Sequence, residues 1–325
     1  MARQRSDRLI RHPGRGGHLS GFTLVELVMV IALAGLVAVM IGTVLSRPMQ
    51  GFVDQSRRAE LVDLAATALN RMARDVRLAV PNSVRVSADG NAIELLLIQT
   101  GPTNPDFSGA ARYRPNRMGS EVLRFAETAP ANCASTVTGG ACNVIELLAP
   151  GFDPAGARWM VVYNIGSEAG GSPVAGANVW APANPGVITP TGTSFSVAGT
   201  AGGETQIALD LPGSGSEFAF AFESPQRRVY FAEAVVGYRC NPSTGQLVRY
   251  SYTQLLGAVP ATPPADSNPS LLANNVTGCT FLYQPVEPDQ PVTNVRAGLV
   301  SMTLQLAQEG ESLQLLQQVH VDNAP

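Results

Sequence analysis

The sequence predicts an α+β fold, in which a long N-terminal α-helix packs on a C-terminal antiparallel β-sheet domain with loop insertions. An apolar run, Phe22–Leu45, contains a single charged residue, Glu26. An amphipathic pattern with helical spacing then continues to Val80. The rest of the chain is rich in glycine and proline, and turn residues separate its short alternating apolar segments, which is typical of strands joined by loops.

The start of the chain predicts a leader peptide followed by a membrane-spanning helix. Met1–Gly21 is rich in arginine and shows no periodicity, which is typical of a leader. Phe22–Leu45 would form a helix about 36 Å long, at about 1.5 Å per residue, enough to cross a bilayer core. Because basic segments stay in the cytoplasm, we expect a single-pass protein of the bacterial inner membrane, with its C-terminal domain in the periplasm.

The helix is expected to continue beyond the membrane and to pack on the β domain. Pro48 should kink or break it, because proline removes one helical hydrogen bond, and Pro81 should end it. Asp54–Arg58 and Arg71–Asp75 are i,i+4 ion pairs expected on the polar faces. The apolar stripe recurs at spacings of three and four residues and consists of Leu61, Leu64, Ala65, Ala68, Leu69, Met72 and Val76.

Residues 81–325 are predicted to form the β-rich domain. Two loops are expected at Thr100–Gly119 and Ala258–Asn275, and Gly166–Gly203, which has little apolar pattern, is expected to be a long surface insertion or mobile flap. The predicted strands are Val84–Ser87, Ala92–Gln99, Glu121–Glu127, Asn143–Leu148, Arg158–Ile165, Gln206–Leu211, Phe218–Phe222, Arg228–Arg239, Leu247–Tyr252, Thr280–Tyr283, Gly298–Leu306 and Leu313–Val321.

Composition argues against several function classes. The leader holds five of the 22 basic residues and one of the 25 acidic residues, which leaves 17 basic and 24 acidic residues, so no nucleic-acid partner is predicted. The chain has no lysine, which excludes a Walker A loop and a Schiff-base lysine. His320 is the only histidine after the leader, too few for a histidine metal site. We therefore predict no enzymatic activity, no cofactor and no metal.

The four cysteines predict two disulfides, because the periplasm is oxidising. Three pairings are possible. Cys133–Cys142 and Cys240–Cys279 are favoured because each pair shares a local segment. A zinc site is the alternative, and the lack of any C-x-x-C spacing argues against it.

The segment Gly21–Leu27 reads GFTLVEL and admits three interpretations. The first is a plain membrane anchor with an acid near its end, the second is a secretory signal cut after Ala34, and the third is a prepilin-type signal. The secretory signal fits poorly, because the apolar run continues well beyond Ala34. GFTLVEL resembles the signature of type IV pilins and type II secretion pseudopilins. That resemblance implies that a prepilin peptidase cleaves after Gly21 and methylates the amine of Phe22, with Glu26 as the fifth mature residue.

A carboxylate in an apolar helix is costly unless a cation lies beside it. Cleavage after Gly21 would create a positive amine on Phe22. In a stack of such helices, Glu26 of one subunit can pair with that amine or with a neighbour's. We therefore expect Glu26 to set the axial register of a fibre.

Two further resemblances narrow the family. The hairpin around Val229–Cys240 and Gly245–Tyr250 is similar to J-type minor pseudopilins of type II secretion. Arg47–Arg58, Pro81–Val86 and Val319–Pro325 resemble the MshO family of minor pilins, from the mannose-sensitive haemagglutinin (MSHA) pilus. These likenesses cover residues 21–99 and 226–325, whereas residues 100–225 match no family that we can name.

The sequence thus predicts a minor pilin that primes or caps an MSHA-like type IV pilus. The expected partners are a prepilin peptidase, other major and minor pilins, and the inner-membrane assembly platform. A J-like minor pseudopilin is the alternative, and a membrane-anchored periplasmic enzyme or adhesin is the alternative of another class. Trp159 is expected in the core, and Trp180 in the loop insertion, with a ligand contact at Trp180 as a lesser possibility.

Overall fold

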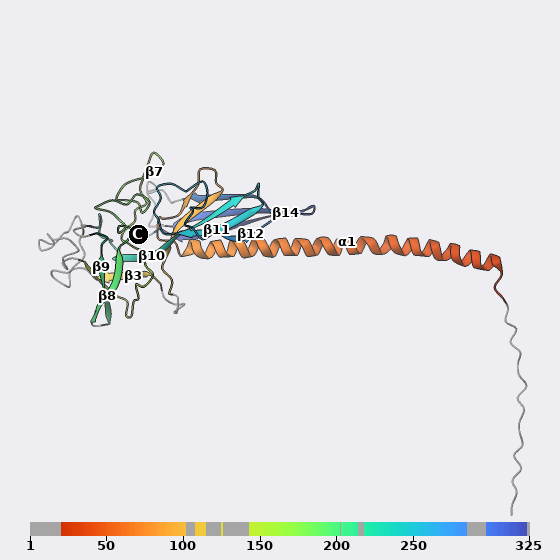
Figure 1. Ribbon diagram of the computed structural model, residues 1–325, viewed down its shortest axis with the longest axis horizontal. Helices are drawn as coiled ribbons and strands as arrows, with labels where there is room; N and C mark the ends of the chain where they lie inside the picture. The colour runs from red at the N-terminus through yellow and green to blue at the C-terminus, as the bar shows by residue number, and fades with distance from the viewer. Residues whose placement is uncertain are drawn as a thin grey trace, which may run out of the picture. The chain divides into compact units, whose positions relative to one another are not determined.

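The computed structural model describes residues 21–101, 108–114, 125, 143–201, 203–213, 218–284 and 297–323 (Figure 1). The described chain combines one long helix with antiparallel strands, so the predicted α+β class is confirmed. The chain divides into two compact units, Met1–Ser56 and Arg57–Pro325, and the division falls within the helix. We call the second the β-rich unit.

The helix α1 spans Leu24–Arg77 and is 54 residues long. The predicted break near Pro48 is wrong: the helix continues through this residue, since the turns on either side supply their own hydrogen bonds when one is lost. The helix ends because the chain then bonds to strand β2 (Ala92–Ile98). The Val80 N–H donates to the Leu96 carbonyl over 2.8 Å, and the Leu78 carbonyl accepts from the Ile98 N–H over 2.9 Å.

The strands of the β-rich unit form a ten-stranded sheet, a three-stranded sheet and a two-stranded ribbon within the described residues. The ten-stranded sheet follows the order β1-β2-β10-β3-β4-β9-β8, with β11 and β5 also paired to β10, and β12 paired to β11. The three-stranded sheet is β13-β14-β15, and the ribbon is β6-β7. The strands are β1 (Arg85–Val86), β2 (Ala92–Ile98), β3 (Ala110–Arg114), β4 (Val144–Leu147), β5 (Trp159–Val161), β6 (Glu168–Ala169), β7 (Ser172–Pro173), β8 (Ser194–Ala201), β9 (Glu204–Asp210), β10 (Arg228–Asn241), β11 (Gln246–Tyr252), β12 (Ser270–Ala273), β13 (Val276–Gln284), β14 (Ala297–Gln308) and β15 (Glu311–Asp322).

Strand β10 connects the parts of the large sheet. Its N-terminal part pairs with β3 and β5, and its C-terminal part pairs with β2 and β11. Most of its 14 residues are buried or half-buried, as expected for a strand that has partners on both edges. The strands predicted at Val84–Ser87 and Ala92–Gln99, joined by the turn residues Ala88-Asp89-Gly90-Asn91, form the hairpin β1–β2, and the predicted hairpin around Cys240 is β10–β11.

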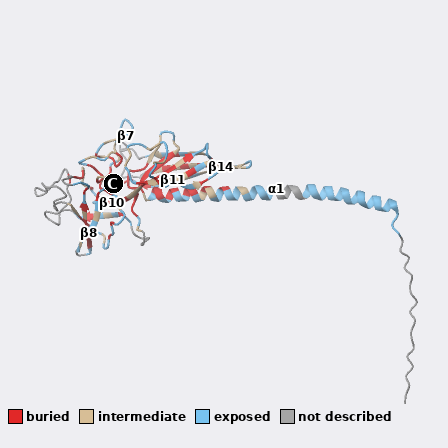
Figure 2. Ribbon diagram, viewed as in Figure 1, coloured by how far each residue is buried: buried red, intermediate tan, exposed pale blue. Residues whose placement is uncertain are grey.

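The predicted apolar stripe of the helix enters the largest core. Leu61, Met72 and Val76 are buried, together with side chains from β2, β10 and all three strands of the β13-β14-β15 sheet (Figure 2). Two further clusters fill the rest of the β-rich unit, one around Phe220 and Phe231 and the other around tryptophans of β5 and the segment before β8. The part of α1 from Arg57 onward therefore belongs to the β-rich unit.

Four predictions for the β domain need correction. The segments Thr100–Gly119 and Ala258–Asn275 are not loops throughout, because they contain the strands β3 and β12, which pair with β10 and β11. The other two corrections concern Gly166–Gly203 and Phe218–Phe222.

Gly166–Gly203 is not a surface flap: Val179, Trp180 and Ile188 are buried in one of the cores, and β6, β7 and β8 lie in this segment. Phe218–Phe222 is not a strand, because only isolated bridges at Phe220 pair it with the chain. The predicted strand Glu121–Glu127 lies outside the described residues except for Phe125.

Candidate functional site

The helix begins at Leu24, three residues after Gly21 of the predicted processing junction. Thr23 caps it: its hydroxyl oxygen accepts a hydrogen bond from the Glu26 N–H over 3.3 Å, and its carbonyl accepts from the Leu27 N–H over 3.1 Å. Thr23 and Glu26 have the spacing of a capping box, and an acid in the first turn is favoured by the helix dipole. Reasoning from the sequence missed this local role of Glu26, although the pattern Thr-x-x-Glu signals it.

The helix exposes an apolar surface along its whole N-terminal part. Leu24–Val44 is 21 residues long, every residue in it is exposed, and it is the one helix in the described chain long and apolar enough to cross a membrane (Figure 2). Phe22, just before it, is 79% exposed. A folded protein rarely exposes so large an apolar area to water, and the length and composition of this helix are compatible with a single-pass membrane anchor.

The glycines of this segment leave room for close helix contacts. A Cβ added at Gly35 or Gly42 would have no neighbouring atom within 4 Å in the chain. The conformation of the chain itself therefore does not require glycine at either place, whereas small residues allow helices to approach closely in membranes.

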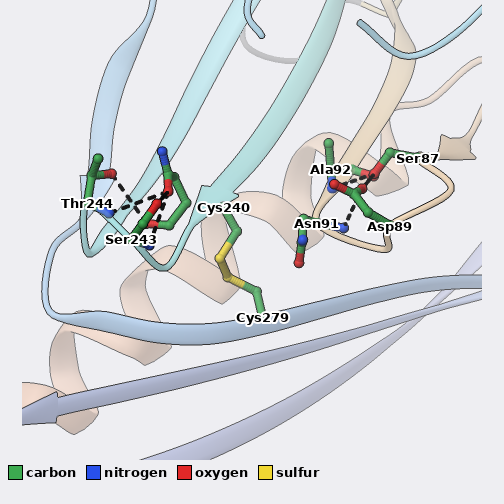
Figure 3. Close-up of a disulfide and its surroundings, with 9 residues drawn as sticks. Ser87, Asp89, Asn91, Ala92, Cys240, Ser243, Thr244 and Cys279 are labelled. Atoms are coloured by element: carbon green, nitrogen blue, oxygen red, sulfur yellow. Dashed lines mark hydrogen bonds between the residues drawn. A yellow bond between two sulfur atoms is a disulfide. The ribbon is translucent and has the colours of Figure 1, made fainter. Parts of the chain in front are cut away.

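One disulfide joins the two larger sheets beside the largest core of the β-rich unit. Cys240 at the end of β10 bonds to Cys279 in β13, with their Cα atoms 6.3 Å apart (Figure 3). This is the pairing favoured from the sequence. Cys133 and Cys142 lie outside the described residues.

The β1–β2 turn lies beside the disulfide and is hydrogen-bonded to the two strands that the disulfide joins. In the β1–β2 turn, the side chain of Ser87 bonds to Asp89 (Figure 3). The Asn91 carbonyl accepts from the Cys240 N–H over 2.9 Å, and the Gly90 carbonyl accepts from the Phe281 N–H over the same distance. The turn therefore connects β10 with β13 independently of the sulfur atoms.

A buried carboxylate network joins β1, β2 and β11 of the large sheet. Glu94 is fully buried, and its Oε2 accepts from Arg85 Nη2 over 2.6 Å and from Nε over 3.1 Å. Its Oε1 accepts from the hydroxyls of Tyr250 and Tyr252 over 2.8 and 3.0 Å. Burial, and then the Glu94 charge, raise the pKa of both tyrosines, so they remain hydrogen-bond donors.

The strand register explains how Tyr250 reaches Glu94. Both residues are opposite Gly237 of β10, on its two sides. A Cβ on Gly237 would overlap the Tyr250 ring. Tyr250 therefore crosses β10 over the position that lacks a side chain.

A second network fixes the helix to the sheet. Asp75 of α1 is buried, and its Oδ2 accepts from the Tyr238 hydroxyl over 2.6 Å and from Arg249 Nε over 2.8 Å. Burial is the main cause that raises the pKa of Tyr238, with the Asp75 charge second. Arg71 lies 3.8 Å from Asp75, as the i,i+4 spacing predicted, but Asp75 faces the core rather than a polar face.

The remaining candidates for chemistry are structural. Trp180 is buried: its indole N–H donates to the Ser83 carbonyl over 3.0 Å, and the Arg85 guanidinium lies 3.7 Å from its ring centroid. Trp159 is fully buried, as predicted. In the part of the chain that the structure describes, no three histidine, cysteine or acidic side chains are grouped so as to hold a metal ion.

The chain matches no family model, no curated protein and no solved structure in comparisons with known proteins.

Proposed function

We propose that the protein is a minor type IV pilin of the MSHA type, cut and methylated at Phe22 and assembled by packing of its N-terminal helix. One observation carries the proposal: an exposed, membrane-length apolar helix begins at Leu24, two residues after the Gly21–Phe22 junction, and holds a carboxylate in its first turn. A plain membrane anchor needs neither the Gly–Phe junction nor the carboxylate. The β-rich unit would then meet other minor pilins.

A J-like minor pseudopilin is the second candidate. The observation that favours it is the β10–β11 hairpin, whose sequence is similar to that family and whose strands pair over seven residues. The two candidates differ in the assembly they join, and the helix would work in the same way in both.

The processing step is tested by mass spectrometry of the N-terminus in cells that have a prepilin peptidase. We expect a chain that starts at methylated Phe22. A chain that keeps Met1, or that starts at another residue, contradicts the proposal. Because the chain has no lysine, amine-reactive reagents give a second readout, since the α-amine is its only amine of that kind.

The role of Glu26 is tested by two variants that separate charge from capping. Glu26→Gln removes the charge, while glutamine still suits the third position of a capping box. Thr23→Ala removes the cap and keeps the carboxylate. We expect Glu26→Gln to reduce recovery of the subunit in purified fibres severely and Thr23→Ala to reduce it little. The reverse order would show that Glu26 acts only within its own helix.

A further inference from the structure

An open pocket with two arginines lies on one face of the β3–β10 pair. Its volume is about 500 Å³, and its lining includes Arg112, Arg228, Tyr230 and Asp322. Alanines of β3 and the Leu148–Ala149 segment after β4 supply apolar walls. The pocket therefore combines charged groups with a short apolar surface.

The strand register places the two arginines side by side. Arg112 of β3 and Arg228 of β10 are direct partners in the antiparallel ladder. Residues that alternate with them, Tyr113 and Val229, are buried in the core on the opposite face. Like charges directly opposite each other destabilise a sheet, so an anion between them is favoured.

The chain balances only one of these two charges. Asp322, at the end of β15, accepts from Arg228 Nη1 over 3.2 Å. The side chain of Arg112 is exposed and forms no ion pair or hydrogen bond in the described structure. The pocket therefore carries an excess positive charge, and its guanidinium groups have the planar donor geometry that suits a carboxylate.

We infer that this pocket binds a carboxylate group on a short apolar stem, held by Arg112 and Arg228 against the alanine walls. The inference does not depend on the proposed function. An acidic side chain of a partner protein and a small organic acid present the same chemistry, and the choice of probe distinguishes them.

The test is a calorimetric titration of the purified full chain in an uncharged detergent. The probes are succinate, the blocked peptide acetyl-Ala-Glu-Ala-amide, and inorganic phosphate. We expect at least one carboxylate probe to bind and phosphate to bind more weakly. Tighter binding of the peptide assigns the site to a protein partner, and tighter binding of succinate assigns it to a small acid. If neither carboxylate binds, or phosphate binds best, the inference is wrong.

Charge variants assign the binding to this pocket. Arg112→Gln should weaken binding about tenfold or more, because a charged hydrogen-bond partner is lost. Arg158→Gln is the matched control, since Arg158 is also exposed and lines a different pocket. Asp322→Asn should strengthen binding, because it removes the carboxylate that competes for Arg228. Equal affinity in Arg112→Gln and in the control would overturn the inference.

Discussion

At the scale of single residues, Glu94 shows how the fold holds a buried charge with its own groups. Arg85 neutralises it, two tyrosine hydroxyls complete its hydrogen bonds, and the Arg85 Nη1 donates to the Leu256 carbonyl over 2.7 Å. A buried pair is tolerated when its remaining donors and acceptors are satisfied in this way. Glu94 is thus a structural group, and the arrangement leaves none of its described oxygens for a substrate.

Gly237→Ala is expected to destabilise the β-rich unit by about 1–3 kcal/mol, the usual cost of overpacking. The added Cβ would displace the Tyr250 ring and break its bond to Glu94. Denaturant unfolding followed by near-ultraviolet circular dichroism measures the change. Gly257→Ala is the matched control, because a Cβ there has no atom within 4 Å. Equal losses in both variants would contradict the account.

The tyrosine network also predicts a dependence on alkaline pH. The pKa values of Tyr250 and Tyr252 are raised in the folded chain, above about 10 for an exposed tyrosine. Between about pH 10 and the higher pKa of the folded state, the unfolded chain has lost tyrosine protons that the folded chain keeps. The free energy of unfolding is therefore highest below about pH 10 and falls as the pH rises above it. Unfolding of the wild type and Tyr250→Phe at several pH values checks this, and the variant should show a shallower fall.

At the scale of elements, the sequence predicts those whose partners lie nearby in the chain. The apolar stripe of α1 and the hairpins β1–β2 and β10–β11 follow from periodicity and turn residues. The segment Gly166–Gly203 does not, because Val179, Trp180 and Ile188 are buried only through contacts with distant strands. The continuation of α1 through Pro48 was likewise beyond local reasoning, since proline lowers helix propensity wherever it stands.

The disulfide is expected to stabilise the contact between the two larger sheets by about 4 kcal/mol, as the loop entropy for a separation of 39 residues indicates. A variant with both Cys240→Ala and Cys279→Ala should lose about this much in denaturant unfolding, yet keep the native circular dichroism, because the β1–β2 turn still bonds to β10 and β13. Loss of the folded spectrum in water would show that the turn contacts are not sufficient.

At the scale of the whole molecule, the chain separates a membrane-length apolar segment from a folded unit. The described side chains of Gly21–Val44 and Gly51–Ser56 are all exposed, whereas burial begins with the residues after Arg57. The residues expected to act in processing and register, Gly21, Phe22 and Glu26, could be proposed from the sequence alone because their spacing is local. The pocket at Arg112 could not, because it requires the pairing of β3 with β10.

A chain truncated to residues 57–325 is therefore expected to fold and to melt at nearly the same temperature as the full chain. A truncation that starts at Asn70 is the contrasting variant, since it removes the buried side chains of Leu61, Ala65, Ala68 and Leu69. Thermal melting by circular dichroism distinguishes the two. A large drop in melting temperature for the first truncation would show that residues 1–56 stabilise the β-rich unit.

The burial of both tryptophans gives the molecule a built-in optical reporter. Trp159 and Trp180 are the only two in the sequence, and both lie in the β-rich unit. Their fluorescence emission will therefore report on unfolding of that unit and will not respond to changes confined to the apolar helix. A dye attached near Phe22 would follow helix association separately, so a single sample can tell loss of assembly from loss of fold.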